Sequence, residues 1–294
     1  MNVKVKQHNS RTYGNARLYG TLIKLLKVLD VKVLYVFANV CIIPITLLFS
    51  AGARIAYNYY RKQRNLGRIK ALTATYRNHC LFAETVIDKF AVYAGKRINF
   101  EYEGLDLYNT MQLRKESLLQ LGAHIGCSEL LGYTLKRNKP YTVLVDGTET
   151  PALMKYRSAA FAQTNIKMIP VGDVSGSSEK IEKAFERGEI IGAFADRYVN
   201  PKKVITSKIY NDQILLARGP FSLAVTRGLD VVMVNAMKEK DGSYHAFFTQ
   251  LHYDKTLPPK QQRQQLADAY TAEIERLLDK YPEQWFNYFD FDRK

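Results

Sequence analysis

Residues 118–129 read Leu-Leu-Gln-Leu-Gly-Ala-His-Ile-Gly-Cys-Ser-Glu, and this stretch decides what kind of fold the chain can adopt. The apolar run Leu118–Ala123 predicts a buried β-strand. Gly126 then permits the sharp turn that is needed before a helix, which we expect to begin near Cys127. The stretch therefore predicts a strand, a turn and a helix. His124 falls at the carboxyl end of the strand, where open α/β sheets place their chemistry.

Outward from this stretch, apolar β-type runs alternate with amphipathic helical stretches, which is the pattern of an α/β sheet covered by helices. A hairpin is expected around Asp241-Gly242, because Asp-Gly favours a tight turn. We therefore expect an α/β fold with a mixed, mostly parallel sheet flanked by helices. The expected strands are 98–102, 116–123, 141–146, 166–170, 190–195, 231–236 and 244–251, and the expected helices are 71–95, 127–137, 150–161, 178–187, 220–227 and 260–280.

The N-terminal 70 residues form a basic, apolar arm. They contain 13 Lys and Arg and one acidic residue, Asp30, and so carry most of the formal net charge of +15. The uncharged run Val33–Ala53 is long enough, as a helix, to match the thickness of a bilayer's hydrocarbon core, roughly 30 Å. Before it, leucines recur at helical spacing, as in a basic amphipathic helix at a membrane surface. We expect residues 1–70 to anchor an α/β domain, residues 71–294, to an anionic membrane.

The depth of this arm in the membrane stays open at the level of sequence. Asn39 and Pro44 interrupt the apolar run and charges flank it on both sides, so the run either spans the bilayer or only dips into it. A buried core helix is the less favoured alternative. A cleaved signal peptide fits poorly, because its charged leader would be unusually long and Arg54 follows the apolar run at once.

Composition and motifs exclude several classes of protein. With 47% hydrophobic and 24% charged residues, the chain is an ordinary globular protein. Nucleic acid is not an expected partner, because the excess positive charge lies in the arm and the remainder is nearly neutral. No P-loop, G-x-G-x-x-G, H-E-x-x-H or G-x-S-x-G motif is present. The three cysteines lack metal-ligand spacing and the five histidines are scattered, so we expect no metal or cofactor and a reducing, cytosol-facing domain.

The pattern H-x-x-x-x-E occurs twice, at His124–Glu129 and at His79–Glu84. His79 and Glu84 lie inside an expected continuous helix, where a separation of five residues leaves the side chains about 140° apart. His124 and Glu129 are separated by a turn. Glu129 can therefore reach one imidazole nitrogen while the other takes a proton from a bound hydroxyl, which makes a general-base dyad. A helix-capping histidine with a surface glutamate beyond it fits the spacing equally well.

Four blocks of sequence, in order along the chain, resemble the lysophospholipid acyltransferase superfamily, and within it the branch of late acyltransferases of lipid A biosynthesis. Any one block would be weak, but four in this order and spacing are specific. The blocks are 121–129 (LGAHIGCSE), 168–170 (MIP) with 189–196 (EIIGAFAD), 217–228 (ARGPFSLAVTRG) with 231–234 (VVMV), and 282–285 (PEQW). The resemblance also includes the basic N-terminal arm.

The resemblance implies a reaction. It makes His124 the base that activates an acceptor hydroxyl for attack on an acyl thioester, and it makes Glu129 the residue that orients His124. It implies an acyl carrier protein thioester as the donor, in preference to acyl coenzyme A, and a lipid as the acceptor. It also implies an enzyme at the inner membrane with its catalytic domain facing the cytoplasm. A covalent route through a Cys127 thiolate is a minor alternative, because the family's chemistry needs no protein nucleophile.

The resemblance further implies a set of substrate-binding residues. Arg157 occupies the place of a basic cluster that contacts acidic head groups, with a solvated helix face as the alternative. Asp196 and Arg197 end a strand at the same sheet edge as His124, and Asp196 could hold Arg197 or Arg157 or belong to a structural ion pair. Gly219 opens a helix whose free N–H groups could stabilise an oxyanion or bind phosphate, although a plain helix start explains it equally well.

Two departures from the family pattern concern the acceptor. The lipid A branch has Asn-Trp where this chain has Cys127-Ser128, and the C-terminal tail Phe286–Lys294 also differs from the branch. The acceptor is therefore a lipid A precursor or a related lipid, with aminolipids, phospholipids and polyene pigments as alternatives. A non-catalytic basic membrane adaptor is the rival from another class of protein. It explains the arm but leaves the ordered blocks unexplained.

Overall fold

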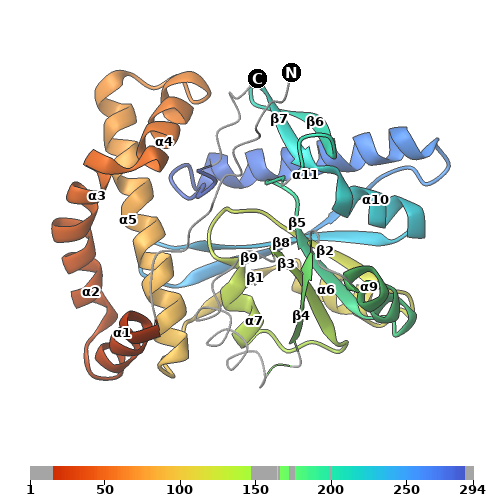
Figure 1. Cartoon of the computed structure of the whole chain (residues 1–294), viewed down its shortest axis with the longest axis horizontal. Coiled ribbons are helices and arrows are strands. Elements are labelled where there is room, and N and C mark those ends of the chain that lie inside the picture. Colours follow the sequence, from red (N-terminus) through yellow and green to blue (C-terminus); the bar gives the residue numbers. More distant parts are fainter. Residues whose placement is uncertain (1–15, 147–163, 165, 172–175, 199, 289–294) are drawn as a thin grey trace.

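The computed structural model describes residues 16–146, 164, 166–171, 176–198 and 200–288. Within them the chain forms a seven-stranded sheet covered by helices, and the helices of the arm stand together at one side of it (Figure 1). This confirms the expected α/β fold with a mixed, mostly parallel sheet. The expected helix 150–161, and Arg157 with it, lies outside the described residues.

The sheet has the strand order β1-β9-β8-β2-β5-β3-β4. From β8 to β4 all neighbouring strands are parallel, while β9 returns antiparallel to β8 and β1 pairs in parallel with β9. The turn between β8 and β9 contains Asp241-Gly242, as expected, and Gly242 has the positive φ of 93° that this turn requires. The strands are β1 (Phe100–Glu103), β2 (Leu118–Gly122), β3 (Tyr141–Asp146), β4 (Ile166–Val171), β5 (Ile190–Phe194), β8 (Asp230–Lys238) and β9 (Tyr244–Leu251).

Strand β2 lies at the centre of the sheet and is buried along its whole length. Because side chains alternate between the faces of a strand, Leu119 and Leu121 join the core under α9, α10 and α11, whereas Leu118 joins the core under α6 and α7. Because both faces of this strand are buried, its sequence is apolar along nearly its whole length. The covering helices are α6 (Leu105–Gln112), α7 (Leu131–Thr134), α9 (Ser177–Glu186), α10 (Arg218–Arg227) and α11 (Pro259–Lys280).

The arm consists of several helices packed side by side. The segment Val31–Phe49 is one 19-residue helix of mean hydropathy 2.1, long and apolar enough to cross a membrane, and 11% of it is buried. A π-helical turn, Ala38–Ile42, comes just before Pro44. Proline has no backbone N–H and cannot donate the usual helical hydrogen bond, so the regular α-helical pattern is interrupted there. Helix α5 lies between this helix and the body of the protein (Figure 1). The helices of the arm are α1 (Ala16–Val28), α2 (Val31–Phe37), α3 (Ile43–Phe49) and α4 (Ala51–Lys62), and α5 (Arg68–Tyr93) follows them.

Several elements differ from the sequence-based expectation, and one of them is α6, which was not expected. The expected helix 127–137 is a 3₁₀ turn, Ser128–Leu130, followed by the single turn of α7, because the chain becomes extended at Leu135. An antiparallel hairpin of β6 (Val204–Ile209) and β7 (Asp212–Ala217) was not expected at all. Its two-residue turn contains no glycine, and Tyr210 supplies the positive φ of 51° instead.

Candidate active site

His124 and Asp196 follow the ends of two neighbouring parallel strands, β2 and β5. The register pairs Gly122 with Phe194, so the residues two positions further on emerge side by side at the carboxyl edge of the sheet. The Nδ1 atom of His124 lies 2.8 Å from Oδ1 of Asp196, and the backbone N–H of His124 donates to Oδ2 at 2.8 Å. Because a carboxylate only accepts hydrogen bonds, Nδ1 carries the proton and Nε2 keeps its lone pair in the neutral ring.

The Asp196 carboxyl group is fully buried. Burial by itself raises the pKa of Asp196, but the charge and the hydrogen bonds of His124, together with the charge of Arg197, outweigh burial and lower the pKa below its ordinary value. Asp196 is therefore ionised at neutral pH. A buried carboxylate at this distance orients the imidazole and stabilises its protonated form.

Arg197 is held by the C-terminal segment of the chain. Its Nε donates to Asn287 Oδ1 and its terminal nitrogen donates to the Phe286 carbonyl, both at 3.0 Å. Asn287 in turn donates through Nδ2 to the backbone carbonyl of Asp196 at 2.8 Å. From the sequence, the Asp196 side chain is expected to bind Arg197 or Arg157, or to belong to a structural ion pair. Instead the Asp196 side chain holds His124, and Arg197 fixes the backbone around it.

The P-E-Q-W block also packs against the His124 turn. Phe286 N–H donates to the His124 carbonyl at 2.7 Å, and Gly126 N–H donates to the Gln284 carbonyl at 2.9 Å. Between them Ile125 and Trp285 form an antiparallel β-bridge. The block therefore extends the backbone pairing beyond the end of β2 and holds His124 in place.

Glu129 lies on the other side of the same turn and faces α5. Its carboxylate accepts hydrogen bonds from the hydroxyls of Tyr93 at 3.0 Å and Tyr133 at 2.8 Å, and Lys89 Nζ lies 3.4 Å away. Among the described residues, no hydrogen bond joins the His124 ring to Glu129. The structure thus places the Glu129 side chain, in the 3₁₀ turn, against α5 and α7 and not against the imidazole with which it was expected to pair.

Comparison with protein families identifies the chain. Residues 82–288 match the family described as bacterial lipid A biosynthesis acyltransferase. The chain belongs to this acyltransferase family. The match covers His124, Asp196 and the C-terminal segment, whereas the apolar helix Val31–Phe49 lies before it. Comparison with curated protein sequences found no match.

An aromatic side chain stands beside His124 in this acyltransferase. The ring of Phe194 lies 5.0 Å from the His124 ring, and it is 40% exposed although it belongs to a central strand. Gly122 makes room for it, since a Cβ atom there would approach the Phe194 ring to 3.1 Å. The His124 side chain itself is 32% exposed. The acyltransferase thus presents an apolar surface directly beside an accessible imidazole.

The remaining predicted site residues take different positions. Gly219 lies in the first turn of α10, where a Cβ atom would meet nothing within 4 Å, so the space beside it is open. The backbone N–H of Ala217 donates to the Ala195 carbonyl at 2.8 Å, which ties the start of α10 to the strand end that carries Asp196. Arg157 lies outside the described residues.

The two residues of the second H-x-x-x-x-E pattern, His79 and Glu84, make separate contacts within the folded chain. His79 is buried in α5, where its Nδ1 lies 2.9 Å from the Thr75 carbonyl, and burial lowers the pKa of His79. Glu84 accepts a hydrogen bond from Asn39 of the arm at 2.9 Å. The two side chains of this pair thus serve different contacts. This agrees with the expectation that a continuous helix separates them.

Cys127 is unsuited to act as a nucleophile. Its side chain is buried, and burial raises the pKa of the thiol to about 12, so the thiolate is negligible at neutral pH. Its backbone N–H donates to the Ala236 carbonyl at 2.7 Å, which fastens the turn to β8. Among the described residues, no group of three metal-ligating side chains is found.

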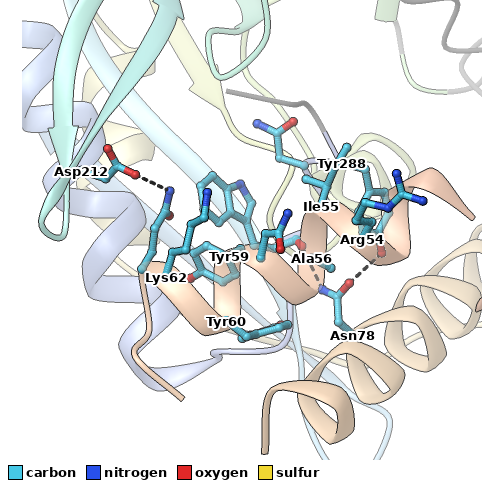
Figure 2. Close-up of a pocket in the computed structure, with 13 residues that line it drawn as sticks. Arg54, Ile55, Ala56, Tyr59, Tyr60, Lys62, Asn78, Asp212 and Tyr288 are labelled. Carbon is cyan, nitrogen blue, oxygen red and sulfur yellow. Dashed lines mark hydrogen bonds between the residues drawn. The ribbon is translucent and has the colours of Figure 1, made fainter. Parts of the chain in front are cut away.

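A cavity of about 110 Å³ lies between α4 of the arm and the C-terminal segment (Figure 2). Arg54, Asn78 and Tyr288 contribute to its wall, and the Tyr288 hydroxyl donates to Asn78 Oδ1 at 2.8 Å. Asn287 lines it as well and, as described above, binds the backbone of Asp196. Through Asn287 the cavity therefore adjoins the backbone around Asp196. His124 is not among the residues that line the cavity.

Proposed function

We propose that the chain transfers a fatty acyl group from an acyl carrier protein thioester to a hydroxyl of a lipid A precursor or a related membrane lipid. Membership of the acyltransferase family supports the class of reaction. The observation that carries the proposed mechanism is the hydrogen bond between His124 Nδ1 and the buried Asp196 carboxylate at 2.8 Å. That bond leaves Nε2 as the basic atom of an accessible ring.

In the proposed reaction, Nε2 of His124 removes the proton from the acceptor hydroxyl. The acceptor oxygen then forms a bond to the carbonyl carbon of the thioester, and the carbon–sulfur bond breaks. The imidazolium returns its proton to the leaving thiolate, so His124 ends the cycle neutral. Asp196 stabilises the imidazolium while it exists, which is the role of the carboxylate in serine hydrolase triads.

The other predicted residues have supporting roles in this proposal. Glu129 acts as a positioning residue, because its bonds to Tyr93 and Tyr133 hold the turn that carries His124 against α5. The backbone N–H of Gly219, in the first turn of α10, is proposed to contact the oxyanion or a phosphate of the acceptor. Arg157 remains a proposed contact to an acidic head group.

The acceptor is tested by lipid analysis of a strain that lacks the chain. We expect one membrane lipid to lose one acyl group and to regain it when the wild-type chain is supplied, but not when the His124→Ala variant is supplied. The mass of the affected lipid distinguishes a lipid A precursor from an aminolipid, a phospholipid or a pigment ester. An unchanged lipid profile would contradict the proposed function.

The donor is tested with purified enzyme and two thioesters of matched chain length, one on acyl carrier protein and one on coenzyme A. We expect faster turnover with the carrier protein. The positive charge of the arm attracts either acidic donor and cannot by itself discriminate between them, so equal rates would remove this part of the proposal.

A further inference from the structure

The arm presents a broad apolar face to the outside of the molecule. On the helix Val31–Phe49 eight large apolar side chains are exposed, from Ile42 at 43% to Phe49 at 85%. The arm also exposes large apolar side chains on α1 and at the start of α5. These exposed side chains are Leu25, Val28, Val33, Val36, Phe37, Val40, Ile42, Ile45, Leu48, Phe49, Ile69 and Leu72. A face of this kind marks a membrane or partner interface.

The body of the protein lies beside this helix along most of its length, not at one end of it. Near the start of the helix, the Tyr35 hydroxyl donates to Asp88 of α5. Near its middle, Asn39 Nδ2 donates to Glu84 at 2.9 Å and the Tyr76 hydroxyl donates to the Asn39 carbonyl at 2.9 Å. Helix α5 therefore runs antiparallel to the apolar helix, as Figure 1 shows, and these hydrogen bonds hold the two helices together.

Helix α5 also contacts the α/β body. Asn78 Nδ2 donates to the Trp285 carbonyl at 2.9 Å, and the Asp88 carboxylate binds Lys238 of β8 at 2.5 Å. The Asp88 and Lys238 side chains are almost fully buried. Lys238 Nζ also lies 3.1 Å from the Tyr35 hydroxyl, so a buried charge of the body directly contacts the helix that carries the apolar face.

We infer that the helix Val31–Phe49 lies along the membrane surface, with its apolar face in one leaflet, and does not span the bilayer. A perpendicular helix would carry α5, the Asp88–Lys238 pair and the adjoining sheet to the depth of the hydrocarbon core. Charged and polar surface at that depth is strongly unfavourable. A helix parallel to the surface buries the same apolar side chains and leaves the body in water.

The charges around the face indicate an anionic lipid surface as the partner. From Ala16 to Ala83 the chain has a single acidic residue, Asp30, and its carboxylate caps the following helix through the Lys32 N–H. Basic side chains lie at both ends of the apolar helix, with Lys24 and Lys27 before it, Lys32 in its first turn, and Arg54, Arg61, Lys62, Arg64, Arg68 and Lys70 after it. Such side chains reach the phosphates of one leaflet when the helix lies flat.

This orientation also brings the proposed active site close to the lipid. Phe82 of α5 is 40% exposed, and its ring lies 5.4 Å from that of Phe286, whose N–H donates to the His124 carbonyl. If the proposed function holds, a lipid acceptor reaches His124 from the membrane without entering bulk water. The orientation of the helix itself does not depend on that function.

Depth measurements on the full chain in phosphatidylglycerol and phosphatidylethanolamine vesicles test the orientation. Cys41 lies exposed near the middle of the helix, while Cys80 and Cys127 are buried. A fluorescent label is placed on Cys41, or on Val33→Cys or Leu48→Cys with Cys41→Ser. The Cys41→Ser variant without a new cysteine controls for labelling of the buried thiols.

Quenching by lipids that carry the quencher at graded depths then separates the two orientations. We expect equal, shallow depths at 33, 41 and 48, all in the leaflet to which the protein was added. A deep label at 41 between shallow labels at 33 and 48 in opposite leaflets would overturn the inference. The depth of the labels is measured without enzymatic turnover. The test of the helix orientation is therefore independent of the proposed function.

A charge on the apolar face tests that the same face meets the lipid. Val40→Asp is expected to weaken binding of the full chain to these vesicles by at least about 10-fold. The matched control is Leu113→Asp, because Leu113 is an equally exposed apolar residue outside the arm. Equal effects of the two substitutions would contradict the assignment of the face.

Discussion

At the scale of single residues, the two ring nitrogens of His124 have different surroundings. Nδ1 contacts the buried Asp196 carboxylate, whereas the ring as a whole is 32% exposed and has no second hydrogen bond among the described residues. The low pKa of Asp196 keeps that carboxylate charged. The contact with Asp196 therefore holds the proton on Nδ1 and leaves Nε2 as the atom that can accept a proton, as a general base must.

Substitutions at three positions separate the proposed base, its orienting carboxylate and the positioning residue. His124→Ala should lower kcat by roughly 10²–10⁴, and Asp196→Asn should do so by a similar factor because an amide cannot stabilise the imidazolium. Glu129→Gln should cost less than about 10-fold, since its carboxylate bonds to tyrosines and not to the ring. The measurement is steady-state turnover of folded protein.

The matched control for this series is His252→Ala, because His252 is an exposed histidine outside the site. It should retain wild-type turnover. If Glu129→Gln lost as much turnover as Asp196→Asn, the assignment of the orienting carboxylate to Asp196 would be wrong.

Phe194 is a second residue whose role can be tested. Its exposed ring beside His124 is placed to contact an acyl chain or the apolar part of the acceptor. Phe194→Ser should raise KM for one substrate about 10-fold by removing apolar contact area, whereas Phe194→Leu should change it about twofold. KM values for donor and acceptor, measured separately, identify the substrate. Unchanged KM values for both substrates would exclude the contact.

At the scale of elements, the turn after β2 depends on contacts from three directions, two of them through the backbone and one through side chains. The C-terminal segment pairs with it at Ile125, β8 accepts the Cys127 N–H, and α5 binds Glu129. The conformation of this turn requires glycine at position 126, because Gly126 has a φ of +55°. A Cβ atom there would lie 2.0 Å from the Ala236 carbonyl oxygen.

Gly126→Ala should therefore destabilise the protein and displace His124. We expect a loss of roughly 3 kcal/mol or more, because backbone strain and a clash with a sheet strand add together. The measurement is denaturant unfolding together with turnover. Gly228→Ala is the matched control, since Gly228 has a similar φ of +59° but nothing within 4 Å of a Cβ atom. Equal losses in the two variants would show that the close approach to β8 does not matter.

At the scale of the whole molecule, a buried polar network joins the arm to the sheet. Lys238 of β8 lies 2.5 Å from Asp88 of α5 and 3.1 Å from the Tyr35 hydroxyl of the apolar helix. Tyr244 of β9 donates to the same Asp88 carboxylate at 2.5 Å. The arm, α5 and the sheet therefore meet at one ion pair that is closed to water.

Removing the cation from this network should loosen the arm. Lys238→Met is expected to destabilise the protein by about 3–5 kcal/mol, because it leaves the Asp88 carboxylate buried without a positive partner. Adding Asp88→Asn should restore more than half of the loss. Unfolding in detergent micelles measures both effects. Lys240→Met, an exposed lysine two residues further on, should stay within about 0.5 kcal/mol of wild type, and a loss there as large as at Lys238 would argue against the network.

Much of the fold follows from local patterns in the sequence. The apolar runs predicted the seven strands of the main sheet, and Asp241-Gly242 predicted the hairpin between β8 and β9. The β6–β7 hairpin was not predicted, because its turn has no glycine. Its strands do show partly alternating buried and exposed side chains. Local patterns report side-chain periodicity and turn geometry, and these are properties of neighbouring residues.

The sequence by itself determined that His124 ends a buried strand, that a glycine turn follows, and that a basic arm with an apolar helix precedes the domain. Only the tertiary structure decided that Asp196, and not Glu129, binds the imidazole. That choice depends on β2 and β5 being neighbours in the sheet, and strand order is set by packing between residues far apart in the chain. The same reason applies to the C-terminal segment against the His124 turn and to the body beside the apolar helix.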